Sequence, residues 1–464
     1  AVSAQDFLSP LRWPVHCHMT SPERQRVLLV TSVFVDLIGV ALVVPLLPMR
    51  LRELGASQRT AGLVSSAYSA AQICGGLALG VLSDRCLGRR GLLLLSFAGA
   101  GSAYAILGLP HVPLELVVLS RVIVGLTKQT MTASAAMMTE LTAEGAERAC
   151  WIGRLSSAAQ TAWISGQALG GLLNRGSARA PAAVAVGLYA MDFTIVRSAL
   201  PASPPAPGHA GGTAEGLPQG QAGQGKSRGT ARVLAAFASP ELARIVFVRL
   251  LEQFVMQAIF TTRALYELDR WALTREEIGY LASFKSLVGV FSSWHLAGSL
   301  SRRFSCTSLL YGATTVAMAA YLLESVPGAA VLRAVEATAP GRALWAALGR
   351  FLSEKLRKDP SLLVFCVACF PAYAACNQVV TIALKSRFTE VVPKANVAAA
   401  LSSLDVMQSA VGVVAPLAGG LLFNGLAPTQ VPLLSAALHA AVVLLLLGCF
   451  PLGQPEAQKG SKAQ

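Results

Sequence analysis

Charged residues are scarce in this chain: Asp, Glu, Lys and Arg make up 13% of its 464 residues, while 54% are hydrophobic. Soluble domains carry about 25% charged residues, and a soluble protein of this length could not bury so much apolar surface. The positive mean hydropathy of +0.56 agrees with this. The composition therefore argues against a soluble protein and predicts an integral membrane protein.

Motifs of several enzyme classes are also missing. The sequence contains no nucleotide-binding loop, nucleophile triad or metal-ligand constellation, so we expect neither primary pumping nor enzymatic catalysis. Its nine cysteines form no disulfide framework, because most fall in apolar segments or on the side where thiols stay reduced. Cys366, Cys369 and Cys376 offer one CxxC on an apolar helix with no second ligand pair. We expect these cysteines to pack between helices, with no metal and no cofactor.

The chain does contain long apolar segments. A segment of about 20 residues at 1.5 Å each crosses the hydrocarbon core of a bilayer. Twelve segments meet this length, centred near 26–48, 61–82, 91–110, 114–136, 151–173, 180–200, 244–262, 278–300, 307–326, 361–384, 395–423 and 430–452. The predicted fold class is an all-α integral membrane protein with twelve transmembrane helices in two pseudo-symmetric six-helix bundles.

The basic residues indicate orientation rather than nucleic-acid binding. The net charge is +14, but the cations sit in short connections between spans, and we expect a lipid bilayer and no nucleic acid as partner. More of them fall on the side of the N-terminus, which predicts cytoplasmic N- and C-termini in a membrane that the sequence does not identify. The first apolar run is long and follows Arg24 and Arg26, so we expect a first span rather than a cleaved signal peptide.

A Pro- and Gly-rich stretch divides the chain into two halves, and it is expected to be flexible. The halves echo one another, as an internal duplication predicts: Gly80–Arg85 corresponds to Gly298–Arg303, and Gly166–Gly171 to Ala415–Gly420. The predicted parts are a cytoplasmic segment (1–25), an N-terminal bundle (26–200), a cytoplasmic linker (201–243), a C-terminal bundle (244–452) with an inserted loop (327–360), and a cytoplasmic tail (453–464). The inserted loop is either an amphipathic surface helix or an insertion without function.

Three motifs lie at characteristic intervals in the first half: Asp36-Leu-Ile-Gly39, the basic run Gly80–Arg90, and Arg121-Val-Ile-Val-Gly125. With them the chain resembles the major facilitator superfamily, and within it the tetracycline-resistance-like proton:drug antiporter group. This resemblance implies transport by alternating access, with Asp36 and Arg121 as candidates for proton coupling. It also implies a conformational latch formed by Gly80, Asp84, Arg85, Gly88, Arg89 and Arg90.

The resemblance has three departures. The basic run carries one extra residue, since both Cys86 and Leu87 stand between Arg85 and the glycine. The helix-packing motif of the fifth span has Ala162 and Gln167 where the family has glycine and proline. The two departures in the fifth span favour uniport or symport relative to antiport. The family glycines that remain, and that we expect to let helices approach closely, are Gly153, Gly166, Gly170 and Gly171.

The charged residues inside the spans are the candidates for proton binding and for ion pairs between helices. Asp36 and Arg121 lie at similar depths by the helical rise, so they could pair and let Asp36 gain or lose a proton. The alternative is a protonated Asp36 that caps a neighbouring helix. Lys128 lies two turns from Arg121 on the same predicted face, and it either lines a substrate cavity or provides a partner for an acid. Arg249 and Glu252, three residues apart, are expected to pair.

Further polar residues complete the predicted cavity. In-membrane charges, Asp192 among them, cost roughly 3 kcal/mol each in hydrocarbon, so they should face one another or a wet cavity. The cavity or substrate candidates are Lys128, Gln129, Glu252, Gln257, Lys285, Asn377, Asp405 and Gln408.

The sequence thus predicts a monomeric secondary active transporter of an unidentified small organic solute, with a proton gradient as its energy source. The alternatives are a proton-independent facilitator of the same fold and a non-transporting receptor or scaffold.

Overall fold

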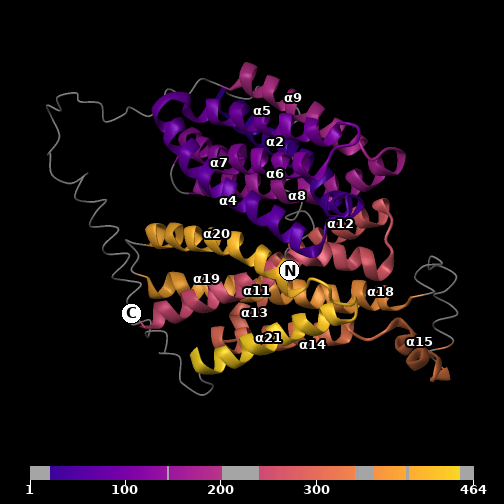
Figure 1. The fold of residues 1–464 in the computed structure, drawn as a ribbon. Coiled ribbons are helices and arrows are strands. Elements are labelled where there is room, and N and C mark those ends of the chain that lie inside the picture. Colours follow the sequence, from indigo (N-terminus) through magenta and orange to yellow (C-terminus); the bar gives the residue numbers. More distant parts are fainter. Residues whose placement is uncertain are drawn as a thin grey trace, which may run out of the picture.

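The computed structural model describes residues 21–143, 146–200, 240–339, 342, 359–392 and 397–449. Among these residues every regular element is a helix. The predicted linker (residues 201–239 of it), both chain ends and residues 343–358 of the inserted loop lie outside the described residues. The two halves form two helical bundles that lie against each other, with the first half in indigo to magenta and the second in red to yellow (Figure 1).

The first half contains six spans. Span one is α2, η2 and α3 in series, span four is the pair α6 and α7, and the others are single helices followed in one case by the turn η3. Their bounds are α2 Ser21–Val43, η2 Val44–Leu46, α3 Leu47–Glu53, α4 Gln58–Leu82, η3 Ser83–Leu87, α5 Gly88–Gly108, α6 Leu114–Thr127, α7 Thr130–Leu141, α8 Ala146–Gly176 and α9 Ala180–Ala199.

The second half repeats this arrangement and adds α15 in the inserted loop. Its bounds are α11 Pro240–Trp271, α12 Arg275–Phe291, η4 Ser292–Ala297, α13 Gly298–Arg303, α14 Cys306–Glu324, α15 Gly328–Glu336, α18 Ser361–Val364, η5 Phe365–Cys369, α19 Phe370–Val391, α20 Val397–Leu422 and α21 Gln430–Cys449. Grouped by position, the described helices make six spans in each half, which confirms the predicted fold class.

Eight of the described helices are long and apolar enough to cross a membrane by themselves. The fourth span is shorter by this measure because it is broken into α6, with 14 residues, and α7, with 12. Helix α12 has 17 residues before the π-helical turn η4 interrupts it. Each broken span therefore has the full length of a membrane span but is not one continuous α-helix.

Local sequence signals determine several helix ends. Ser57 precedes α4, and its Oγ accepts a hydrogen bond from the backbone N–H of Thr60 at 3.2 Å. Before α12, Thr274 and Glu277 form a capping box in which each side chain accepts from the other's backbone N–H. Pro45 and Pro48 fall at η2 and the start of α3, since proline lacks the N–H that a continuous α-helix needs.

The two halves meet along two pairs of helices, α8 with α12 and α4 with α20. Each pair has a point where only glycine fits: a Cβ on Gly279 would lie 2.6 Å from the Cα of Gly171, and a Cβ on Gly62 would lie 3.0 Å from the Cα of Gly420. Each half also has its own buried apolar cluster. The halves are thus separate bodies that touch along smooth, glycine-lined surfaces.

The two ends of the bundle differ in how the halves are joined. We call the end where α9 finishes and α11 starts the linker end, and the other the opposite end. Three ion pairs between the halves lie at the opposite end, where Glu53 accepts from Arg275, Arg52 lies 3.1 Å from Asp269, and Arg175 lies 3.7 Å from Glu276. The described residues thus tie the halves together at the opposite end.

Candidate functional site

Asp36 is the centre of a buried polar cluster in the first half, and its side chain is fully buried in α2. The ammonium of Lys128 donates to Asp36 Oδ1, and the hydroxyl of Thr130 donates to the same oxygen at 3.3 Å. The hydroxyl of Tyr189, from α9, donates to the backbone oxygen of Asp36 at 3.1 Å. Oδ2 of Asp36 is buried without a hydrogen-bond partner. The carboxylate is therefore held on one oxygen only.

Lys128 reaches Asp36 because the fourth span breaks there. The backbone N–H of Lys128 still bonds to the carbonyl of Val124 at 2.8 Å, but Lys128 has ψ of 86°, and α6 ends before it. The next N–H, that of Gln129, donates to the side chain of Ser96 at 3.2 Å. The expected continuous helix over 114–136, with Lys128 on the same face as Arg121, is therefore wrong. Lys128 is thus the partner of an acid, and its predicted role in a substrate cavity stays a prediction.

Arg121 does not pair with Asp36, so that expectation is also wrong. Its side chain is buried in α6, and its guanidinium lies 5.1 Å from the centre of the Tyr104 ring. Tyr104 stacks on Tyr189 with ring centres 5.6 Å apart, and Tyr189 contacts both Asp36 and Lys128. Arg121 thus reaches the cluster through two stacked tyrosine rings rather than through an ion pair.

A second acid completes this cluster. Asp192, in α9, is fully buried near the hydroxyl of Ser32, and neither carboxyl oxygen makes a hydrogen bond of good geometry with a described residue. It is close enough to interact electrostatically with Asp36 and with Lys128. The sequence marks Asp192 only as one more in-membrane charge. We call Asp36, Lys128 and Asp192 the acid-rich cluster, since it combines two acids with one cation.

The second half contains a different cluster around Arg263 of α11. The guanidinium donates to Glu324 at 2.6 Å and to Glu267 at 3.0 Å, and Lys285 of α12 donates to Glu267 at 2.6 Å. Arg263 also donates to the hydroxyl of Tyr373 at 2.9 Å. We call Arg263, Glu267, Lys285 and Glu324 the balanced cluster, since two cations face two acids.

Aromatic rings enclose the Arg263 guanidinium. The ring centres of Phe365, Tyr266, Tyr373 and Tyr321 lie 4.9, 5.0, 5.3 and 5.9 Å from it. Lys285 lies over Phe365 as well, at 5.7 Å. Rings attract a cation through their negative faces and keep water away, so this environment holds the balanced cluster in one arrangement.

Lys285 is the one predicted candidate in the balanced cluster, and the other three members were missed. The seventh span was expected to end at residue 262, which left Arg263 and Glu267 outside the membrane, whereas α11 continues to Trp271. The spacing of Arg263 and Glu267, four residues apart, is the signal that could have extended the span.

Other predicted cavity residues lie apart from both clusters. Arg249 and Glu252 pair at 2.5 Å, which confirms that expectation. Glu252 and Asn377 line a cavity of about 20 Å³ inside the second bundle, room for a water molecule but not for an organic solute. Gln129 is half-buried and donates to the backbone oxygen of Gln72 at 3.5 Å.

The remaining candidates are less informative. Gln257 and Gln408 are half-buried on α11 and α20. Asp405 also belongs to α20, but its side chain lies outside the described residues.

The glycines of the fifth span behave as expected with one exception. A Cβ on Gly170 would lie 2.4 Å from the carbonyl oxygen of Leu42, and one on Gly166 would lie 2.7 Å from the Cβ of Ala41, so both let α8 touch α2. Gly171 meets α12 instead. Gly153 has no atom within 4 Å of such a Cβ, and its expected packing role is wrong.

Gln167 makes a contact that the family proline could not. Its Oε1 accepts from the hydroxyl of Ser286 in α12 at 2.9 Å, which links the two halves. Ser286 follows Lys285, and Gly166, the residue before Gln167, packs on the helix that carries Asp36. Helix α8 therefore packs between α2, which carries Asp36, and α12, which carries Lys285.

The basic run between the second and third spans absorbs its extra residue in the π-helical turn η3. Gly88 follows with a φ of 66°, a conformation that other residues rarely adopt. Arg89 lies 3.5 Å from Glu140, so one arginine meets an acid as expected, and Arg90 donates to the backbone oxygen of Arg197. Both contacts stay within the first half. The side chain of Asp84 is outside the described residues, so its predicted role as a latch stays a prediction.

The chain was also compared with known proteins. The model of the family described as Major Facilitator Superfamily matches residues 29–349. The tetracycline resistance protein, class D, of Salmonella ordonez is 30% identical over 306 residues, which cover 65% of this chain and 73% of that protein. Solute carrier family 67 member A1 of Homo sapiens is 26% identical over 308 residues, covering 64% of this chain and 70% of that one.

Solved structures agree on the fold. The nucleoside transporter NupG superposes with a TM-score of 0.67 over 92% of this chain and 99% of its own, at 14% identity. The human organic anion transporter MFSD10 (TETRAN) gives a TM-score of 0.51 at 20% identity, covering 92% of this chain and all of that chain. At such identities the likeness concerns the fold alone.

Proposed function

The chain belongs to the Major Facilitator Superfamily, and on that premise we propose that it is a proton-coupled secondary active transporter of a small organic solute that works by alternating access. The transport function follows the family. Coupling to protons, the coupling residues and the orientation are the proposed parts. The sequence also resembles, most strongly in its first half, the vertebrate orphan major facilitator superfamily domain-containing protein 9, and we propose kinship with it.

The acid-rich cluster is the observation that carries proton coupling. With Asp36 and Asp192 both ionised, Lys128 leaves one negative charge uncompensated in a buried site, which is costly at low dielectric. Binding one proton makes the cluster neutral. Losing that proton becomes favourable only when water or a cation reaches the cluster. Proton occupancy is thereby linked to which end of the bundle is open.

Arg121 has a supporting part in this proposal. It keeps its charge at all relevant pH values, and it lies one stacked tyrosine pair away from Asp36. A shift of Tyr104 and Tyr189 would bring that charge nearer to Asp36 or take it away. Arg121 would then favour the ionised acid in one conformation more than in the other.

The ion pairs at the opposite end are the basis on which we propose a conformation for this structure. If the linker end is cytoplasmic, as the distribution of Lys and Arg predicts, the pairs of Arg275, Arg52 and Arg175 close the outer face. The described arrangement then corresponds to a state that opens inward. The glycine-lined contact of α8 with α12 is the surface along which the halves would rock.

Reconstituted flux tests the proposal. Purified protein in liposomes would be offered a panel of metabolites and drugs, tetracycline included, with and without an imposed pH gradient. We expect accumulation of at least one compound to require the gradient and to be lost in Asp36→Asn. The control is Arg59→Ala, because Arg59 is exposed at the opposite end, far along the chain from either cluster.

Two outcomes would replace the proposal. Flux that ignores the gradient, with Asp36→Asn fully active, identifies a facilitator. No flux of any compound by folded protein, together with no substrate-dependent change in accessibility of introduced cysteines, favours the receptor or scaffold.

A further inference from the structure

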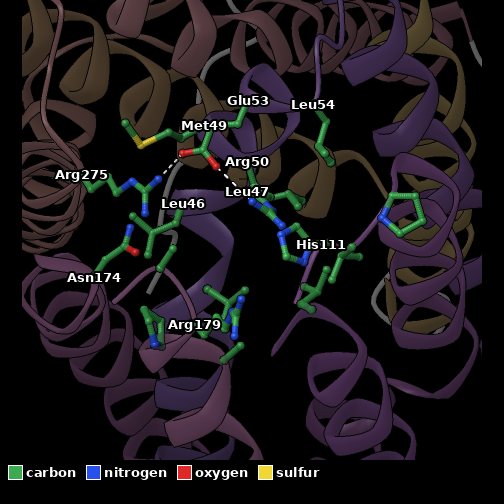
Figure 2. Close-up of a pocket in the computed structure, with 17 residues that line it drawn as sticks. Leu46, Leu47, Met49, Arg50, Glu53, Leu54, His111, Asn174, Arg179 and Arg275 are labelled. Carbon is green, nitrogen blue, oxygen red and sulfur yellow. Dashed lines mark hydrogen bonds and ion pairs between the residues drawn. The ribbon is translucent and has the colours of Figure 1, made fainter. Parts of the chain in front are cut away.

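A separate cavity of about 540 Å³ opens at the opposite end of the first half. It lies where span one ends, between the connection from α5 to α6 and the turn from α8 to α9, with Arg275 contributed by the second half (Figure 2). This volume is in the range of sites for small organic ligands. No part of the acid-rich or balanced cluster lines it.

Positive charge predominates in this cavity. Arg50, Arg179 and Arg275 line it, against the single carboxylate of Glu53. Glu53 accepts from both Arg50, at 3.2 Å, and Arg275, as the dashed lines in Figure 2 show. Arg179 makes no side-chain ion pair with any described residue, and it precedes the first turn of α9, whose N-terminal dipole adds positive potential. An anion would therefore be attracted to the Arg179 side of the cavity.

Asn174 provides a second, independent indication of a ligand. The residue is 7% exposed and lines the cavity, and its amide oxygen is buried without a hydrogen-bond partner among the described residues. A buried amide oxygen without a donor is unfavourable. A ligand that carries a hydroxyl or an N–H could satisfy it. His111, which also lines the cavity, has a φ of 53°, an uncommon conformation that costs free energy and tends to occur at functional sites.

The cavity also has an apolar wall. Val43, Leu46 and Val112 line it and are buried, at 8%, 9% and 2% exposure. Such a wall favours a ligand with an apolar body, because burying that body removes apolar surface from water. A small inorganic anion would leave the wall unused.

We propose that this cavity is a binding site for an amphipathic organic acid with an apolar body, one anionic group near Arg179 and a hydroxyl or N–H near Asn174. The cavity combines Arg179 of the first half with Arg275 of the second. A bound acid would therefore bridge the halves and stabilise the arrangement in which the opposite end is closed. The proposal is independent of proton coupling.

Cholate is a suitable probe, because it has an apolar face, hydroxyl groups and one carboxylate. Its binding would be measured by titration calorimetry below its micelle concentration, with the protein in phosphatidylcholine nanodiscs and empty nanodiscs subtracted. We expect Arg179→Ala to weaken binding by about tenfold or more, since a hydrogen bond to a charged group carries that much, and Asn174→Leu, which removes a neutral hydrogen bond, to weaken it by about fivefold. The neutral methyl ester should bind weakly and not respond to Arg179→Ala.

Matched controls make the test specific. Arg59→Ala removes the same charge at the same end, at a residue that does not line the cavity, so this variant should bind cholate normally. Ala178→Trp fills the cavity from an exposed position and should abolish binding. Unchanged affinity in Arg179→Ala or Ala178→Trp, or an equal loss in Arg59→Ala, overturns the proposal.

The source of the acid is tested by adding phosphatidylglycerol to the nanodiscs. Cholate affinity that stays the same supports a soluble ligand. A loss of affinity that disappears in Arg179→Ala shows that an anionic lipid headgroup takes the same place, which overturns the soluble source.

Discussion

The acid-rich cluster of the first half and the balanced cluster of the second half are built in opposite ways. In the first half, Lys128 holds one oxygen of Asp36, while Asp192 makes no ion pair with any described residue. In the second half, each acid has a cation on it, and Arg263 holds two acids at once. Buried charge is thus left incomplete in one half and compensated in the other.

This difference separates two uses of buried charge. A compensated network of charge-assisted hydrogen bonds resists change, because removing any member leaves a buried charge exposed to low dielectric. An incomplete cluster can bind or release a proton at little structural cost. The second half therefore resembles a fixed support, and the first half is the place where protonation can alter the protein.

The largest expected effect is the loss of stability when the balanced cluster of the second half is disrupted. Arg263→Met leaves Glu267 and Glu324 without their shared cation, and it should lower the free energy of unfolding by about 3–5 kcal/mol, as breaking a buried ion pair does. Lys128→Met should cost less, because Asp36 can neutralise itself by binding a proton. Unfolding in mixed micelles at increasing SDS fraction would measure both. Equal losses would abolish the distinction between the clusters.

A double-mutant cycle then measures the Lys128 to Asp36 interaction. Lys128→Met and Asp36→Asn should each destabilise the protein, and the double variant should be more stable than the sum of the two predicts, by about 1–3 kcal/mol. The same unfolding assay applies. A coupling free energy of zero would mean that the ion pair contributes nothing to stability, despite its burial.

Asp192→Asn tests this comparison further, because it should lower transport activity and leave the stability of the protein almost unchanged. Because Asp192 makes no ion pair with a described residue, we expect a change in unfolding free energy below about 1 kcal/mol, whereas Glu324→Gln should be clearly destabilising. Gradient-driven uptake in liposomes should fall about a hundredfold or more in Asp192→Asn, the size typical of losing a proton-transfer group. Undiminished uptake would remove Asp192 from the proton path.

The smallest expected effect concerns the contact between the halves. Gln167→Ala removes one hydrogen bond with Ser286, which is worth about 1 kcal/mol, and should loosen the contact of α8 with α12. Cysteines introduced near each end would report altered accessibility to a soluble thiol reagent. Thr261→Ala, which affects a hydroxyl bonded only to its own helix, is the control. Identical accessibility in both variants would show that this hydrogen bond does not bias the conformation.

The fold was predictable because the length of each apolar segment can be read directly from the local sequence. Each predicted span coincides with one helix or with a series of shorter helices. The two segments with the weakest apolar signal, near 180–200 and 244–262, correspond to α9 and α11. What the sequence could not specify was the end of α11. Arg263 and Glu267 look like the polar end of a span until Glu324 and Lys285, distant in sequence, are placed beside them.

The site was predicted in part. Asp36 and Lys128 were both singled out, but counting along an unbroken helix assigned Asp36 to Arg121. The break after Thr127 depends on Ser96, which accepts the N–H that the helix leaves free, and this is a contact between spans. Pairing between helices follows from such tertiary contacts, so helical spacing alone cannot supply it.

The π-helical turn η3 has a consequence for how this chain tolerates changes in length. Adding one residue to a regular α-helix rotates everything beyond it by about 100° and moves it by 1.5 Å. In η3 the surplus residue is stored as a local bulge, and Gly88 resets the direction before α5 begins. Deleting Cys86 should therefore leave the apolar face of α5 in register with its neighbours, whereas deleting a residue in the middle of α5 should not. Insertions and deletions can therefore accumulate in this loop without displacing the buried charged residues.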